Sequence, residues 1–224
     1  MEFLFGTLLP KFETMHNHEY TLLGGVNRSL IGRYLGSIAA ILSSVIVFII
    51  LYFVDLAEKF GLPVNVPPAV LSLFGAGAVF GILYWVFDRY LWRFPRISTL
   101  LKLPDLGGAW TCKGVSLDSD GNPQYTWEGK VVIVQTWDRI RVRLTTTNSG
   151  SNSVIAALVF DEADGYQLIY NYRNEPKIDQ PHLNSHLGFS RVTFSPDLNC
   201  AAGEYFNGHG RFTFGKMEWA KSNG

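Results

Sequence analysis

Two stretches in the C-terminal half carry side chains suited to holding a polar ligand with aromatic rings. Residues 170–176 read YNYRNEP and residues 203–215 read GEYFNGHGRFTFG. Tyrosine and phenylalanine rings stack on bases, arginine pairs with phosphate or carboxylate, and Asn and Thr hydrogen-bond to base edges. These are the chemical parts of a nucleotide site. The other interpretation is that the tyrosines belong to a barrel wall, the arginines are solvated, and the glycines relieve crowding at barrel corners.

Sequence motifs for catalysis are missing. The chain has no GxSxG elbow and no HExxH pair, and no paired carboxylates flank an evident cleft. The acidic residues at 161–164 fall within one turn and are expected in solvent. Arg139, Arg141 and Arg143 alternate with aliphatic residues, which predicts a solvated outer face for them. We therefore predict a protein that is not an enzyme.

Cysteine and histidine usage points to neither a metal site nor a disulfide framework. Cys112 and Cys200 are the only cysteines; one bridge between them is compatible with the sequence, but a reducing cytosol is the simpler interpretation. No His/Cys cluster has metal-ligand spacing, and His182, His186 and His209 are expected to be solvated or structural. The formal net charge is +0, so no bulk field attracts DNA or RNA. We expect no metal and no cofactor.

The C-terminal half has the pattern of an all-β domain. Short alternating segments are separated by turn signals such as DSDGNP at 118–123 and NSGSN at 148–152. Eight strands are predicted, at residues 110–117, 125–135, 139–146, 154–161, 166–173, 187–195, 203–207 and 211–220. Mostly tight turns favour an eight-stranded antiparallel up-and-down β-barrel, whose interior is either filled by side chains or holds one small ligand. Trp110 ends a Gly-X-Trp motif that looks like the start of lipocalin barrels, so we expect a lipocalin-like barrel with this ring at its bottom.

Two uncharged apolar runs precede this domain. Residues 34–54 and 69–87 are each long enough to cross the roughly 30 Å hydrocarbon core as a helix. The connection at 55–68 is short and contains three prolines, which stop and restart a helix. We predict a transmembrane helical hairpin and therefore an integral membrane protein.

Basic residues flank the hairpin on both outer sides. They are Lys11, Arg28 and Arg33 before the first run, and Arg89, Arg93, Arg96 and Lys102 after the second. The connecting loop has one lysine against two acidic residues. The positive-inside rule then predicts a multi-pass membrane protein with cytoplasmic N- and C-termini.

The second run also has a face of small residues, Ser72, Ala76, Gly77 and Gly81. Small residues allow close backbone contact between helices in lipid, where no hydrophobic force drives association. This face is predicted to pack on the first helix, to join copies into a homo-oligomer, or to do both. The expected division of the chain is an N-terminal cytoplasmic segment 1–32, the hairpin 33–92, a linker 93–104 and the barrel domain 105–224.

This organisation resembles the two-transmembrane, β-strand-rich effectors of bacterial CBASS antiphage systems, on the domain order and on the YRNEP and GEYFNGHGRFTFG stretches. The resemblance implies that the barrel senses a cyclic di- or oligonucleotide and that the helices then assemble and disrupt the inner membrane. It also implies that the matching residues contact the messenger, with tyrosines on bases and arginines on phosphates. Those residues are Tyr172, Arg173, Asn174, Tyr205, Asn207, Arg211 and Thr213.

Two further hypotheses remain open at this point. One is a membrane-tethered, lipocalin-like carrier of a lipid or another apolar ligand, which requires an apolar cavity. The other is a structural or adaptor module whose barrel is filled by its own side chains. The polarity and volume of the barrel interior distinguish these hypotheses from nucleotide sensing.

Overall fold

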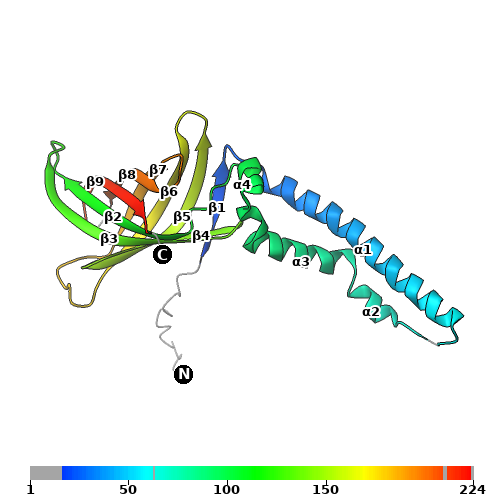
Figure 1. Ribbon diagram of the computed structural model, residues 1–224. Coiled ribbons are helices and arrows are strands. Elements are labelled where there is room, and N and C mark those ends of the chain that lie inside the picture. The colour runs from blue at the N-terminus through cyan, green and yellow to red at the C-terminus, as the bar shows by residue number, and fades with distance from the viewer. Residues whose placement is uncertain (1–16, 63, 209–210, 223–224) are drawn as a thin grey trace, which may run out of the picture.

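The computed structural model describes residues 17–62, 64–208 and 211–222. The protein has two parts, a pair of long helices and a β-sheet domain, and the helices project from one end of the sheet domain (Figure 1). Both predicted parts, the helical hairpin and the all-β domain, are confirmed.

Helix α1 (Arg28–Lys59) begins at Asn27, whose side-chain oxygen accepts a hydrogen bond from the Ser29 amide at 2.9 Å. Its 32 residues are long and apolar enough to cross a membrane, and so is the segment Pro68–Arg89. Most of the apolar side chains on both segments are exposed, as membrane-facing surfaces are.

The second span is broken, whereas the sequence predicts one continuous helix. It consists of α2 (Pro68–Ser72) and α3 (Ala76–Arg89), separated by a turn that ends at Gly75 in an extended conformation. Glycine has low helix propensity, so the Gly-rich stretch is the weak point of the span. The Ser43 hydroxyl of α1 donates a hydrogen bond to the Phe74 carbonyl at this break. A lipid-exposed carbonyl without a partner is costly, so this bond stabilises the broken helix.

Helices α1 and α3 pack together, and the small-residue face lies on the other side of α3. Leu35 and Ala39 of α1 and Phe87 of α3 are buried. The predicted face, made of Ser72, Ala76, Gly77 and Gly81, is exposed. A Cβ added at either glycine of this face would meet no atom within 4 Å. The interpretation that this face packs on the first helix is therefore wrong.

The segment predicted as a linker contains structure. A 3-10 helix, η1 (Leu91–Arg93), follows α3, and helix α4 (Pro95–Leu101) follows it. Leu101, Leu103 and Leu106 are almost fully buried and belong to the core of the sheet domain. The helices therefore join the sheet domain through packed apolar side chains.

The sheet has nine strands, and eight of them form an up-and-down meander. These are β2 (Gly108–Leu117), β3 (Pro123–Gln135), β4 (Arg139–Thr146), β5 (Ser149–Asp161), β6 (Gly165–Pro176), β7 (His186–Phe194), β8 (Cys200–Asn207) and β9 (Phe214–Lys221). Consecutive strands pair antiparallel, and β9 pairs with β2, so the sheet closes into a barrel.

The ninth strand, β1 (His18–Leu23), comes from the segment that we predicted to lie outside the barrel. Strands β4 and β5 pair over three residues near one rim and then diverge. Strand β1 fills this gap, antiparallel to β4 and parallel to β5, with Tyr20 opposite Ala156. The division at residue 32 is thus corrected: residues 18–23 complete the barrel wall, and four residues then lead into α1 (Figure 1).

The end of the barrel nearest the helices is closed by an apolar core. The Trp110 ring is fully buried there, 5.5 Å from Phe194 and 6.3 Å from Trp219 between ring centroids, and its Nε1 donates to the Leu106 carbonyl at 3.1 Å. The predicted position of Trp110 at the barrel bottom agrees with this packing.

Cys112 is buried and Cys200 is exposed, and both are free thiols.

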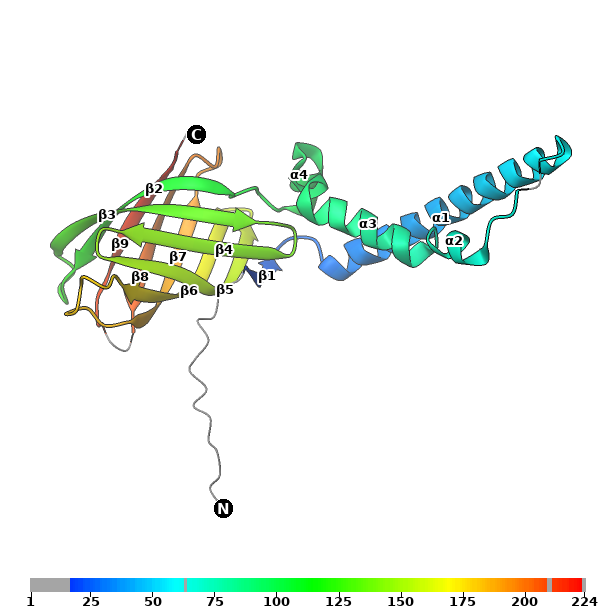
Figure 2. The same ribbon diagram turned by 90° about the horizontal axis from the view of Figure 1, so that it is seen from below.

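The helices contact the turn between β3 and β4 (Figure 2). Arg28 donates to the Trp137 carbonyl at 2.9 Å, and the Tyr84 hydroxyl donates to the Asp138 carboxylate at 2.6 Å. The backbone amide of Asp138 donates to the Asp88 carboxylate at 2.9 Å. These contacts from α1 and α3 to one turn hold the barrel in a defined orientation on the hairpin.

Candidate functional site

A cavity of about 1090 Å³ occupies the end of the barrel that faces away from the helices. Its rim comprises the β2–β3, β4–β5, β6–β7 and β8–β9 turns, which contribute Gly121, Asn148, Leu183 and Arg211 to the lining. Pockets for small molecules span roughly 300–1,000 Å³, so this space is large enough for one sizeable ligand.

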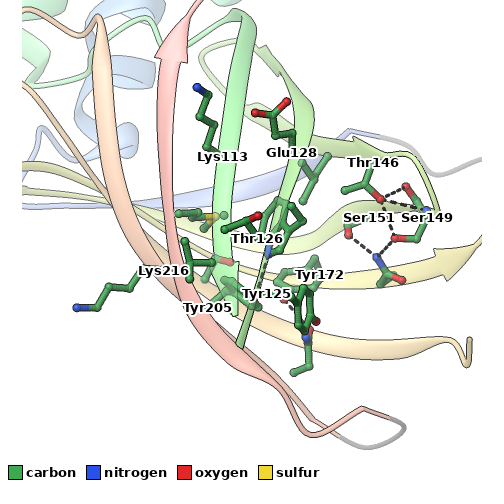
Figure 3. Close-up of a pocket in the computed structure, with 18 of the residues that line it drawn as sticks. Lys113, Tyr125, Thr126, Glu128, Thr146, Ser149, Ser151, Tyr172, Tyr205 and Lys216 are labelled. Atoms are coloured by element: carbon green, nitrogen blue, oxygen red, sulfur yellow. Dashed lines mark hydrogen bonds between the residues drawn. The ribbon is translucent and has the colours of Figure 1, made fainter. Parts of the chain in front are cut away.

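Polar side chains line this cavity because inward positions on several strands are polar in sequence. Strand alternation turns every second residue to the interior. The inward polar residues that line it include Asn174, His186, Ser190 and Asn207. Figure 3 labels five more, namely Thr146, Ser149, Ser151, Tyr172 and Tyr205. The chemistry of the barrel interior therefore changes from apolar at the helix end to polar at the rim end.

Tyr172 of β6 reaches over Gly188 of β7 to Asn207 of β8, along one wall of the cavity. Its hydroxyl donates to Asn207 Oδ1 at 2.8 Å, and Asn207 Nδ2 donates to Thr213 Oγ1 at 2.7 Å. Burial raises the pKa of Tyr172, so the hydroxyl stays protonated and remains a donor at neutral pH. Gly188 on β7 makes room for this ring, since a Cβ there would lie 2.3 Å from Tyr172 Cζ.

Tyr205 of β8 is the centre of a second cluster, which reaches β2 and β3. Its hydroxyl lies 2.6 Å from Ser116 Oγ and accepts a hydrogen bond from Trp127 Nε1 at 3.0 Å. The Trp127 and Tyr205 rings meet edge to face with centroids 5.6 Å apart. Trp127 lies across Gly114, where a Cβ would come within 2.1 Å of the indole. Glycine and two large rings thus shape this wall together.

A hydroxyl and amide cluster forms a third part of the wall. Asn174 Nδ2 donates to Ser149 Oγ at 3.0 Å and to Ser151 Oγ at 2.9 Å (Figure 3). All three side chains are buried, yet each lines the cavity. The cluster offers preorganised donors and acceptors to any group that enters.

Arg211 is a cation at the cavity mouth, and its Nη2 donates to the Tyr125 hydroxyl at 2.8 Å. His186 lines the cavity with its Nδ1 3.1 Å from the Asn184 carbonyl. Burial, with a smaller effect of the Arg211 charge, lowers the pKa of His186. At neutral pH the histidine is uncharged, and the positive charges that line the cavity are those of Arg211, Lys113 and Lys216.

Comparison with known proteins identifies the family. Residues 29–93 match the model described as Cap15, TM helices, and residues 101–221 match the model described as Cap15, cyclic dinucleotide receptor domain. The chain belongs to the Cap15 family. It is also 42% identical over 203 residues to CD-NTase-associated protein 15 of Yersinia aleksiciae, covering 91% of this chain and 96% of that protein. The predicted recognition of a two-transmembrane CBASS effector is confirmed.

The receptor domain defined by the Cap15 family model contains strands β2 to β9 and the whole cavity, whereas β1 lies outside both matched segments. Five predicted site residues line the cavity: Tyr172, Asn174, Tyr205, Asn207 and Arg211. Two residue stretches separated by about 30 positions in sequence are thus brought together by the barrel.

Two predicted residues do not reach the cavity lining. Arg173 is exposed on the outer wall, because β6 continues to Pro176 and alternation therefore turns it away from Tyr172. Thr213 lies behind Asn207 and fixes its amide. The prediction that Arg173 belongs to the cavity residues is therefore wrong.

Several cavity residues are missed by the sequence-based analysis. The turn predicted at 148–152 includes Ser149 and Ser151, although they begin β5. His186 falls between the strands predicted at 166–173 and 187–195, although it begins β7. The signal that could have identified the serines is polar residues at alternate positions, Ser149, Ser151 and Ser153. In the sheet, Ser151 lies opposite Asn174. His209 lies outside the described residues. Among the described residues no group of three His, Cys, Asp or Glu side chains could hold a metal ion.

Proposed function

We propose that this Cap15 family member is an antiphage effector whose barrel binds a cyclic dinucleotide in the rim-end cavity. The observation that carries the proposal is the cavity itself, about 1090 Å³ of polar and aromatic-lined space within the segment that matches a cyclic dinucleotide receptor domain. The messenger is an anion with two bases, and the three parts of the wall offer matching chemistry.

The proposed contacts follow from the geometry of the lining. Tyr172 and Tyr205 supply rings and protonated hydroxyls, and Asn174 supplies an amide for a base edge or a sugar hydroxyl. Arg211 opposes the phosphate charge at the mouth, where a partly exposed guanidinium can move onto an anion. Asn207 and Thr213 hold the C-terminal hairpin in position for these contacts.

The other two hypotheses fit the interior less well. A carrier of an apolar ligand needs an apolar lining, and here Ser149, Ser151, Asn174 and His186 face the space. A purely structural barrel would be filled by side chains, whereas this barrel keeps a cavity of about 1090 Å³ at its rim end. We therefore keep the lipocalin-like description for the shape of the barrel only, and we propose a polar ligand in place of a lipid.

The proposed output is assembly of the hairpins and disruption of the bacterial inner membrane. Both termini are placed in the cytoplasm by the positive-inside rule, where a cytoplasmic messenger reaches the cavity. A ligand that binds the assembled state more tightly shifts the population by its difference in affinity. The exposed small-residue face of α3 is the proposed helix contact between copies, since Gly77 and Gly81 have open space beside them.

The test is a thermal-shift panel of cyclic dinucleotides on the full-length protein in detergent, with matched linear dinucleotides as negative controls. At a ligand concentration of about 100 times Kd, binding adds about 2.7 kcal/mol to stability, which is a clear shift in Tm. Arg211→Ala should reduce the shift, whereas Arg173→Ala, on the outer wall, should leave it intact. If no cyclic di- or oligonucleotide raises the Tm of the wild-type protein, the proposal is rejected.

A further inference from the structure

A row of apolar side chains crosses the outer wall of the barrel. Cross-strand pairing places Phe189 of β7 opposite Phe206 of β8, Phe206 opposite Phe214 of β9, and Phe214 opposite Leu117 of β2. We call these four residues the outer apolar row. Phe206 is 54% exposed and Phe214 is 41% exposed. Four neighbouring strands thus present one continuous apolar ridge to the outside.

Within the described chain two rings of this row, Phe206 and Phe214, remain exposed, and Phe189 is half-buried. The Phe189 and Phe206 rings stack with centroids 5.2 Å apart and an interplanar angle of 25°. Exposed apolar patches of this kind on soluble surfaces mark interaction sites. The inward neighbours Ser190 and Tyr205 face the cavity, and Phe189, Phe206 and Phe214 lie on the opposite side of the same strands, whereas Leu117, at the end of the row, also lines the cavity.

The bilayer is poorly placed to cover this row. The helices attach at the β3–β4 turn, and the row lies toward the other end of the strands, near the rim (Figure 1). The hydrogen bonds from Asp88, Tyr84 and Arg28 fix the barrel to the hairpin. In copies anchored in one membrane, the rows therefore stand at the same height and face sideways, toward a neighbouring barrel.

Charges beside the row fit a second copy of the same surface. Arg191 of β7 and Glu204 of β8 are cross-strand neighbours on the outer wall, adjacent to Phe189 and Phe206. Both are exposed, and within the described residues neither belongs to an ion pair. A two-fold axis between β7 and β8 places Arg191 of each copy opposite Glu204 of the other, and Phe189 opposite Phe206. Such a contact is self-complementary in both shape and charge.

We infer that the outer apolar row is a barrel–barrel interface between two copies of this chain, centred on the stacked Phe189 and Phe206 rings. The inference deepens the assembly step of the proposed function and rests on it. A two-fold contact closes on itself and yields only a pair. The second contact, through the small-residue face of α3, then links pairs into a larger array, because each copy carries two different interfaces.

The experiment measures self-association of the full-length protein in detergent by sedimentation or mass photometry. Phe206→Glu and Phe189→Lys should each weaken association at least about 30-fold, the effect of losing a central interface residue. Mixing the two variants brings the introduced carboxylate of one copy opposite the introduced ammonium of the other across the axis, so the mixture should regain association. Val154→Glu, an exposed apolar site on another strand, is the matched control and should associate like wild type.

Each outcome has one meaning because ligand binding is measured separately on the same samples. Association that is unchanged in both variants overturns the inference, and so does loss without recovery in the mixture. If self-association is unchanged and binding to anionic vesicles is reduced, the outer apolar row contacts the bilayer, and the inferred interface is also rejected. If the panel finds no ligand, the association series is run at rising protein concentration, and recovery in the mixture still supports the interface.

Discussion

The two ends of the barrel are built from the same eight-stranded meander but from opposite chemistry. At the helix end, Trp110, Phe194 and Trp219 close the interior, and the buried leucines after α4 seal it. At the rim end, serines, tyrosines, Asn174 and His186 face a cavity. Packing density stabilises the first end, whereas the second keeps polar groups and empty volume at a cost in stability. The closed end therefore stabilises the fold, and the rim end is the proposed site of recognition.

The largest expected effect comes from removing the plug of the closed end. Trp110→Ala should destabilise the protein by about 3–5 kcal/mol, because it leaves a cavity among Phe194 and Trp219. Urea unfolding followed by fluorescence and circular dichroism measures the change. Trp85→Ala, at an exposed position of α3, is the matched control and should cost far less. A loss of less than about 1 kcal/mol would remove the distinction between the ends.

An intermediate effect is expected at the rim end from Tyr205→Phe. The change deletes a hydroxyl that serves both Ser116 and Trp127, and it leaves the indole N–H without its acceptor. We expect a destabilisation of about 1–3 kcal/mol together with a weaker ligand-induced Tm shift. Tyr34→Phe, on the exposed surface of α1, provides the control. Unchanged ligand response would place the ligand away from this wall.

The smallest effect is a pH dependence from His186. Its pKa is lowered in the folded protein, so the unfolded chain binds the proton more readily and stability falls as the pH drops below the unfolded value of about 6.5. His186→Gln should flatten the dependence of unfolding free energy on pH between about 7 and 5. The same change at His182, which is exposed, should leave the slope as it is. A wild-type slope in the His186 variant would contradict this prediction.

Local pattern is enough to predict much of the fold. The uncharged runs indicate the spans, and the alternation from Arg139 to Leu144 predicts β4 with Ile140 and Val142 inside, as observed. Register and break points depend on distant residues and cannot be obtained in this way. Strand β1 is identified only by partners more than a hundred residues away, such as Ile140 for His18. The helix break is supported by Ser43, on another helix.

The candidate site is predictable where side-chain chemistry and alternation agree. Tyr172, Asn174 and Tyr205 are inward-facing, so their residue types identify them. Arg173 is misplaced by sequence alone because its charge suits the ligand while the end of its strand is unknown. The serines of β5 are missed because Ser-Gly-Ser is typical of a turn unless Asn174 is known to lie opposite. Composition therefore indicates the ligand chemistry, and only the closed sheet selects which residues present it.

Strand β1 has a consequence for how the protein enters the membrane. It precedes the hairpin in the chain, and its partners β4 and β5 follow the hairpin. Because one barrel contains both flanks, both must lie on the same side of the bilayer, and the hairpin between them must cross an even number of times. In a chain inserted with only one crossing, the bilayer would separate β1 from the other strands of the barrel. The barrel can therefore close only when both spans have crossed the membrane, because β1 and its partners then lie on the same side.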